Sequence, residues 1–315
     1  MILTCSNLFD PTRQRCPALT SGGAERPMKR SLFLKTLPLA AATLVAWGSA
    51  HAGLVNDVPS CYAATHIQPD AHPYDKLIYV LVDQTVALDP SLEQSVVDNS
   101  LRMLQPGSKF VIAEFSAFSQ GRYLTVLHTG IIERPLDVSR VSSTSIHAAK
   151  DLDQCLGQQG GFARTMVART LAEVMKASTS SLDQSDILVA FNTVSAAVAS
   201  DPAQHKTVFA ATDGLENSSV TSFYARGSVR DINPSSEMAK AVNAHLLGDF
   251  GGASVYVLGG AMMPPATLGT KGQRDGYRDP HTLSDLSQFW HDYFDRSNAH
   301  LVEFGEPALV QPVSY

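Results

Sequence analysis

Two apolar runs in this chain each end in an aspartate that enters a polar loop. Asp83 follows the run at residues 77–82 and is followed two positions later by Thr85, and Asp213 follows the run at residues 207–212. Carboxylate and hydroxyl oxygens are the ligands that a hard cation such as Mg²⁺ takes from proteins. The two loops together would therefore offer a cation site. The alternative is that these side chains cap the turns and helices that follow them.

The two runs have the composition of buried parallel strands. They are rich in β-branched and aromatic residues and lack the alternation of a half-exposed strand, which is typical of a sheet covered by helices on both faces. In such sheets, ligands bind beyond the carboxyl ends of the strands, where the strand order reverses. We expect Asp83 and Asp213 to lie at the ends of adjacent parallel strands, within reach of one cation.

The remaining elements alternate along the chain. Strands are predicted at residues 77–82, 110–116, 123–132, 207–212, 254–258 and 301–304, and helices at residues 89–103, 162–177, 184–199, 235–247 and 283–297. Only the turn at residues 119–122 separates the second and third strands, which is too short for a crossover helix and predicts an antiparallel hairpin at one edge. The fold class is therefore α/β, with a doubly wound, mostly parallel sheet and one antiparallel edge strand.

The amino-terminal region has the three parts of a secretory signal peptide. A basic stretch begins at Met28, an apolar core follows at residues 32–47, and small residues precede Gly53. We expect translation to start at Met28 and the exported protein, periplasmic or secreted, to begin near Gly53. The alternative is a genuine long leader or a retained amino-terminal anchor. No later segment has about 18 uninterrupted apolar residues, so we expect no integral membrane protein after cleavage.

These features divide the chain into three parts. Residues 1–52 are assigned to the leader and signal peptide, residues 53–74 to an amino-terminal segment, and residues 75–310 to one domain. Within that domain, residues 133–161 are rich in Arg, Ser and Gly and are predicted as an irregular insertion, and residues 261–280 as a long loop.

The net charge and the cysteine content of the exported chain indicate what it can bind and whether it forms a disulfide. Six of the 24 Lys and Arg and two of the 30 acidic residues precede Gly53, which leaves a net charge of −10. A chain of that sign has no electrostatic reason to bind nucleic acid. Cys61 and Cys155 are the cysteines that remain, and in an oxidising compartment we expect them to form a disulfide. Two free buried thiols are the alternative.

The order of elements and the two aspartate loops resemble the von Willebrand factor A domain family, over most of residues 75–307. That family has a Rossmann-like doubly wound sheet and a metal-ion-dependent adhesion site, whose first loop reads Asp-x-Ser-x-Ser and whose third loop often reads Ser/Thr-Asp-Gly. Asp83 and Thr85 match the first loop, and Asp213 matches the third. Ala87 stands where the family places its second serine, so one hydroxyl ligand is missing and the site is degenerate.

The family takes another hydroxyl ligand, a threonine, from a second loop. Thr179, Ser181 and Ser185 are the candidates near the start of the helix at residues 184–199, and Ser181 is taken as the ligand. The resemblance thus implies a Mg²⁺ site made by Asp83, Thr85, Ser181 and Asp213. It also implies a protein partner whose acidic side chain completes the coordination.

We therefore expect an exported, non-enzymatic protein-binding or scaffolding protein with no catalytic residues. One alternative is a metal-free structural subunit of an envelope assembly. Another is a Mg²⁺-dependent phosphatase of the haloacid dehalogenase type, in which Asp83 would be the nucleophile. Such an enzyme carries a second acid two residues later, and Thr85 occupies that position here.

Overall fold

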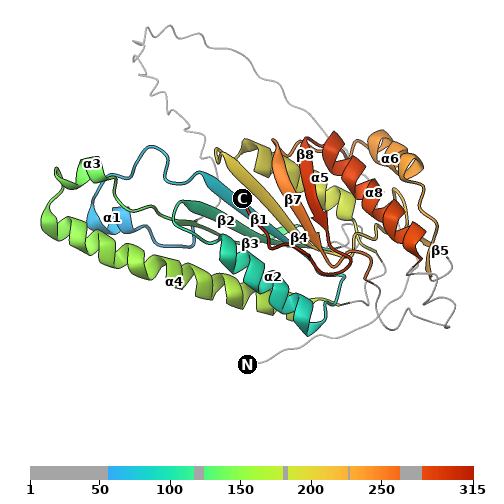
Figure 1. Cartoon of the computed structure of the whole chain (residues 1–315), viewed down its shortest axis with the longest axis horizontal. Coiled ribbons are helices and arrows are strands. Elements are labelled where there is room, and N and C mark those ends of the chain that lie inside the picture. The colour runs from blue at the N-terminus through green and yellow to red at the C-terminus, as the bar shows by residue number, and fades with distance from the viewer. Residues whose placement is uncertain (1–55, 117–123, 180–183, 226–227, 263–278) are drawn as a thin grey trace, which may run out of the picture. The chain divides into compact units, whose positions relative to one another are not determined.

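The computed structural model describes residues 56–116, 124–179, 184–225, 228–262 and 279–315, all within one compact unit that spans Ala52–Tyr315 (Figure 1). The predicted leader and signal peptide, Ser181 and the turn at residues 119–122 lie outside the described residues. So does most of the predicted loop at residues 261–280. No helix in the described ranges is long and apolar enough to cross a membrane.

The described residues form one mixed sheet of six strands in the order β3-β2-β1-β4-β7-β8. Its strands are β1 (Lys76–Asp83), β2 (Ser108–Phe115), β3 (Thr125–Ile132), β4 (His205–Ala211), β7 (Ala253–Leu258) and β8 (Ala299–Phe304). The edge strand β3 runs antiparallel to β2, and the other neighbouring pairs are parallel. The predicted fold class is therefore confirmed. Two short strands that were not predicted, β5 (Tyr224–Ala225) and β6 (Ser228–Val229), form a separate ribbon.

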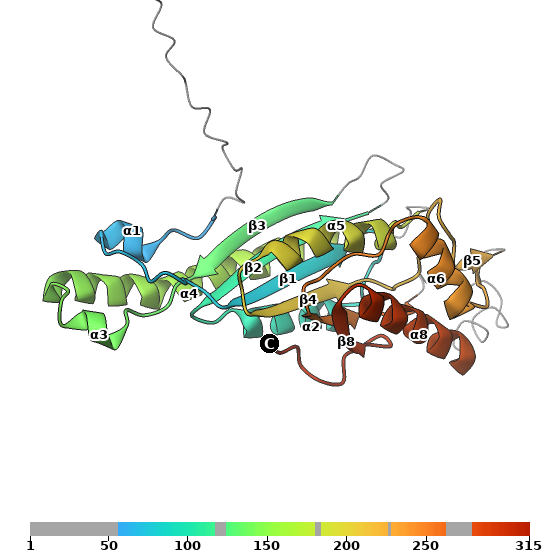
Figure 2. The ribbon, with the colours of Figure 1, turned by 90° about the horizontal axis from the view of Figure 1, so that it is seen from above.

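Helices cover both faces of the sheet (Figures 1 and 2). The helices are α1 (Cys61–Thr65), α2 (Pro90–Met103), α3 (Val138–Val141), α4 (Ile146–Ala177), α5 (Ile187–Ser200), α6 (Pro234–Asn243) and α8 (Pro280–Arg296). Side chains alternate along β1: Ile78, Val80 and Val82 pack with α2 and α4, and Leu77 and Leu81 pack with α5 and α8. This alternation assigns each residue at the end of β1 to one face of the sheet.

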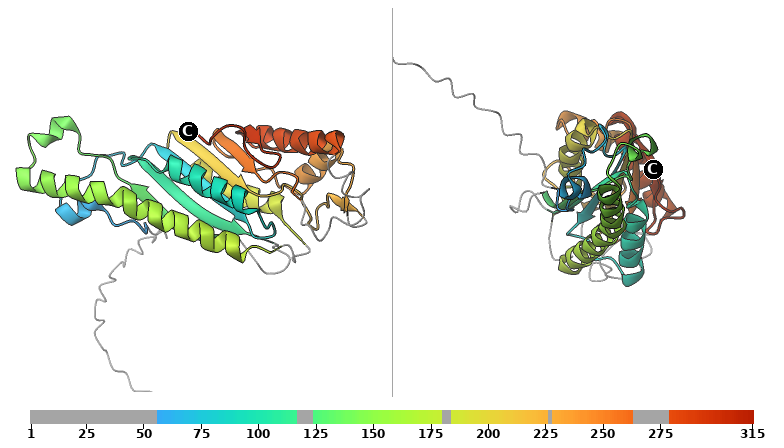
Figure 3. Two further views of the ribbon diagram at one scale, coloured as in Figure 1. Left: turned by 60° about the horizontal axis from the view of Figure 1, so that its bottom comes forward. Right: turned by 90° about the vertical axis from the view of Figure 1, so that its left-hand side faces the viewer.

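Helix α4 corrects the prediction for residues 133–161. That stretch was predicted as irregular, but α4 begins at Ile146 and continues through Gly157, Gly160 and Gly161. Each glycine in a helix costs about 1 kcal/mol relative to alanine. Burial of one face of the helix and a covalent link at Cys155 oppose this cost. The first half of α4 extends beyond the strands, whereas its second half lies beside α2 (Figure 3).

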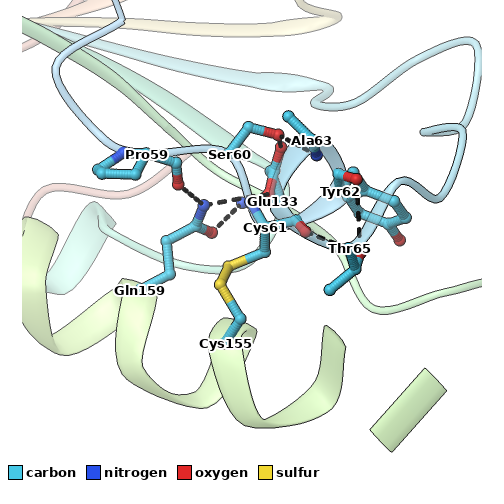
Figure 4. The surroundings of a disulfide bond; sticks show 9 residues. All are labelled: Pro59, Ser60, Cys61, Tyr62, Ala63, Thr65, Glu133, Cys155 and Gln159. Carbon is cyan, nitrogen blue, oxygen red and sulfur yellow. Dashed lines mark hydrogen bonds between the residues drawn. A yellow bond between two sulfur atoms is a disulfide. The ribbon is translucent and has the colours of Figure 1, made fainter. Parts of the chain in front are cut away.

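The expected disulfide between Cys61 and Cys155 is present, with the two Cα atoms 5.6 Å apart. Hydrogen bonds surround it (Figure 4). The Glu133 carboxylate accepts from the Ser60 hydroxyl at 2.5 Å and from the Cys61 N–H at 2.7 Å, and the Gln159 amide donates to the Pro59 carbonyl at 2.9 Å. The amino-terminal segment is therefore joined to α4 by both covalent and polar contacts.

After β8 the chain crosses the face of the sheet that carries α2 and α4. Val313 is buried in the same cluster as Phe209 and Tyr256, and its N–H donates to the Asn99 side chain at 3.0 Å. The Tyr315 hydroxyl donates to the Met103 carbonyl at 2.7 Å. This carboxy-terminal segment covers β4 and β7, so packing continues past residue 310, where the predicted domain ended.

Val313→Ala is expected to lower the free energy of unfolding by about 2 kcal/mol, because it removes buried apolar surface and leaves a cavity. Val310→Ala is the matched control, since Val310 is 91% exposed and Val313 only 1%. Urea unfolding measures both variants. Equal midpoints for the two would show that the segment does not stabilise the sheet.

Candidate functional site

The ends of β1 and β4 lie at the point where the strand order reverses. The chain passes from β1 to β2 on one side of β1 and later returns to β4 on the other side. β1 and β4 are adjacent and parallel, with Val82 paired to Ala211. Asp83 is the last residue of β1, and Asp213 follows β4 by two residues. In an open α/β sheet this is the position at which ligands bind.

Hydroxyl groups from three segments converge on the Asp83 carboxylate. Its Oδ1 accepts from the Thr85 N–H at 2.9 Å and from the Thr85 hydroxyl at 2.6 Å. Its Oδ2 accepts from the Thr212 hydroxyl at 2.7 Å and from the Ser185 hydroxyl at 3.2 Å. Asp83 is only 1% exposed. The structure therefore brings together the loop after β1, the end of β4 and the segment before α5.

Sequence analysis did not assign Thr212 to the site. The alternation along β4 directs Val208 and Ala210 toward α5 and α8, so Thr212 lies on that face too. By the same alternation Asp83 shares the face of Leu81, which explains why the Thr212 hydroxyl reaches it. This periodicity was the signal in the sequence that could have identified Thr212.

The second-loop hydroxyl that reaches Asp83 is that of Ser185. Ser181, the residue taken as the ligand, lies outside the described residues. The Thr179 backbone N–H donates to the Gln84 carbonyl at 2.8 Å, which joins the end of α4 to the first loop. Nothing in the sequence around Thr179, Ser181 and Ser185 indicated which of them supplies the hydroxyl.

Asp213 lies in a turn that is held by α8. Its Oδ1 accepts from the Leu215 N–H at 2.8 Å, and its side chain is buried. The next residue, Gly214, has a φ of 69°, and its carbonyl accepts from the Trp290 indole N–H at 2.9 Å. A Cβ at Gly214 would lie 2.8 Å from that indole nitrogen, so this position requires glycine.

The two aspartates have no cationic partner among the described residues, where neither forms an ion pair. Burial raises the pKa of Asp83, although hydrogen bonds from Thr85, Thr212 and Ser185 oppose the shift. Burial, together with the nearby charge of Asp83, raises the pKa of Asp213 well above its usual value. Two carboxylates that share a buried site repel each other, and a bound cation would remove that cost.

The donor set fits a hard cation. Each hydroxyl that donates its proton to Asp83 keeps oxygen lone pairs for a metal, and Mg²⁺ prefers such oxygen ligands together with water. The described residues contain no cluster of three or more His, Cys, Asp or Glu side chains. A metal at this site would therefore depend on Asp83, Asp213, hydroxyl groups and water. These ligands are all oxygen atoms, whereas a typical zinc site is made by nitrogen and sulfur ligands.

The strand order and the site define a doubly wound α/β protein whose architecture fits the Rossmann-like fold of von Willebrand A domains. Comparison with protein-family models and with curated proteins finds no match. Among solved structures, the chain is similar to the N-terminal domain of TFIIH p34, with 10% sequence identity and a TM-score of 0.23. The alignment covers 70% of this chain and 99% of that one.

Proposed function

We propose that this chain is an exported, non-enzymatic protein-binding or scaffolding protein whose von Willebrand A-like domain holds Mg²⁺ at the ends of β1 and β4. The observation that carries the proposal is the convergence of three hydroxyl groups on the buried Asp83 carboxylate. Asp213 follows the adjacent parallel strand β4, and neither aspartate forms an ion pair within the part of the chain that the structure describes. The proposed ligands and supporting residues are Asp83, Thr85, Ser185, Thr212 and Asp213.

A bound Mg²⁺ would supply positive charge that attracts an acidic side chain of a protein partner. Asp83 would orient the hydroxyl groups of Thr85, Thr212 and Ser185, since it accepts a hydrogen bond from each. Export is supported by the signal-peptide pattern before Gly53 and by the disulfide, because disulfides persist in oxidising compartments.

Millimolar Mg²⁺ is expected to raise the melting temperature of the wild-type protein, and Asp83→Ala is expected to abolish this response. A ligand that binds only the folded state stabilises it by about 2.7 kcal/mol at 100 times its Kd. Ala87→Ser should enlarge the response, because it adds a hydroxyl where the family has a ligand. The measurement is thermal unfolding with Mg²⁺ and with chelator.

Asp89→Ala is the control for this measurement. Asp89 caps α2 by accepting from the N–H groups of Ser91 and Leu92, and it makes no hydrogen bond to a proposed ligand among the described residues. Its loss should lower the melting temperature by the same amount with and without Mg²⁺. The proposed site would be contradicted if Mg²⁺ did not change the melting temperature of the wild type. It would also be contradicted if Mg²⁺ still raised the melting temperature of the Asp83→Ala variant.

A metal-free structural subunit of an envelope assembly is the second candidate. It is favoured by the fact that the Asp83 carboxylate already has four hydrogen bonds within the protein. Pulldown from an envelope extract distinguishes the two candidates. Partners released by chelator support the metal-dependent function, and partners retained equally in chelator and in Mg²⁺ support the structural one.

The arrangement does not favour a phosphatase of the haloacid dehalogenase type. A nucleophilic carboxylate must have an oxygen free to attack substrate, whereas both oxygens of Asp83 accept hydrogen bonds and the residue is 1% exposed. Thr85, at the position of the second acid, donates its proton to Asp83. Phosphate release from generic substrates that is lost in Asp83→Asn would restore this alternative.

A further inference from the structure

Glu216 is a buried acid that none of the proposed ligand roles explains. It lies in the turn after Asp213 and is 0% exposed. Among the described residues it forms no ion pair with Lys, Arg or His. Burying a carboxylate without a cation is costly, so a protein that retains one uses it for a contact that an apolar side chain could not make.

That contact is with the amino terminus of α5. The Glu216 Oε2 accepts from the Leu188 N–H at 2.9 Å, in the first turn of the helix. The residue at the usual capping position, Asp186, makes no side-chain capping hydrogen bond to α5. The acceptor for this end of the helix therefore comes from a segment 28 residues away in the chain.

A backbone bridge joins the same two segments. The Ser185 N–H donates to the Asn217 carbonyl, and the Asn217 N–H donates to the Ser185 carbonyl, each at 3.0 Å. Ser185 is thus held on both sides, by the bridge at its own backbone and by Glu216 at the helix that begins two residues later. Its hydroxyl lies 3.2 Å from Asp83 Oδ2, which is the longest of the four hydrogen bonds to that carboxylate.

We propose that Glu216 is a positioning residue for the cation site: by anchoring the start of α5 to the turn after Asp213, it holds the Ser185 hydroxyl at Asp83. This inference rests on the proposed function. Glu216 itself is not one of the proposed ligands, since its Oε2 accepts from the Leu188 N–H at the start of α5. It acts through Ser185, and it couples the second loop of the site to the third.

The experiment measures the Kd for Mn²⁺, an oxygen-preferring substitute for Mg²⁺, from the electron paramagnetic resonance signal of the free ion. Two substitutions of similar length form a matched pair. Glu216→Gln keeps an oxygen acceptor for the Leu188 N–H, and Glu216→Met removes it. Loss of a residue that orients a metal ligand typically weakens metal binding by 10- to 100-fold. We expect Glu216→Met to raise the Kd by about 10-fold or more and Glu216→Gln to keep it within about 3-fold.

A double substitution tests whether Glu216 acts through Ser185. Ser185→Ala alone should raise the Kd, and Glu216→Met added to it should raise the Kd no further, because effects that pass through one shared group are not additive. Asn233→Ala is the control for loss of a helix cap elsewhere, since Asn233 caps α6 by accepting from the Ser236 N–H at 2.9 Å. It should lower the melting temperature and leave the Kd unchanged.

Each outcome decides one question. A wild-type Kd in Glu216→Met, or a loss in the double variant equal to the product of the two single losses, would overturn the positioning role while the cation site stands. No Mn²⁺ binding by the wild-type protein would overturn the cation site and the positioning role together. If Glu216→Met does not fold, Glu216→Leu removes the same acceptor and is measured in its place.

Discussion

Loss of the disulfide between Cys61 and Cys155 is expected to lower the free energy of unfolding by about 4 kcal/mol. The two cysteines are 94 residues apart in the chain, so the bond closes a long loop and restricts the unfolded state strongly. In the folded state it fixes the amino-terminal segment to α4, beside the Glu133 and Gln159 hydrogen bonds. We expect those hydrogen bonds to remain when the bond is broken, and therefore expect destabilisation without loss of the sheet.

The measurement is denaturant unfolding of the protein that begins at Gly53, which has no other cysteine. The oxidised wild type is compared with the Cys61→Ser, Cys155→Ser double variant, and the reduced wild type should unfold like that variant. Reductant added to the double variant is the control and should have no effect. An unchanged midpoint after verified reduction would show that the bond does not contribute to stability.

Glu216→Gln is expected to flatten the dependence of stability on pH. Burial raises the pKa of Glu216 to about 8. Between about pH 4.5 and pH 8 the folded state holds this proton and the unfolded state has released it, so stability falls as pH rises. At 1.36 kcal/mol per pKa unit the loss for this group alone is on the order of 5 kcal/mol. Below that window, both states are protonated and the group has no effect.

Urea unfolding in chelator between pH 5 and pH 9 measures the effect without bound metal. The free-energy difference between Glu216→Gln and wild type should grow in favour of the variant as pH rises. Glu237→Gln is the contrasting variant. Hydrogen bonds from Thr221, Lys240 and Arg230 lower the pKa of Glu237 although burial opposes them, so its loss should not stabilise the protein at high pH. Parallel pH profiles for wild type and Glu216→Gln would contradict the prediction.

The parts of the fold that sequence predicted are those whose own residues specify them. The run that became β1 is continuously apolar because helices cover both of its faces, and the same holds for β4. The short turn predicted at residues 119–122 made an antiparallel pairing the simplest connection, and β2 and β3 are antiparallel. Asp83 and Asp213 could be identified because each directly follows such an apolar run in the sequence.

The parts that sequence missed depend on contacts between distant segments. Ser185 reaches Asp83 because Asn217 and Glu216 hold the start of α5, and no pattern near Ser185 carries that information. The first half of α4 contains glycines that predict irregular chain, whereas packing and the link at Cys155 keep it helical. Val313 lies in a short segment without periodicity, and its burial follows from packing with Phe209 of β4 and Tyr256 of β7.

Helix α4 passes through two very different environments along its axis. In its first half Ile146 is 85% exposed, and a side chain at Gly157 or Gly161 would meet no atom within 4 Å. Toward its end, Val167 and Leu171 are fully buried against the sheet. Backbone amides in the two halves must therefore open with different free energies, even though they belong to one continuous helix. Amide hydrogen exchange along α4 should then report two rates, the faster one in the half that carries the disulfide.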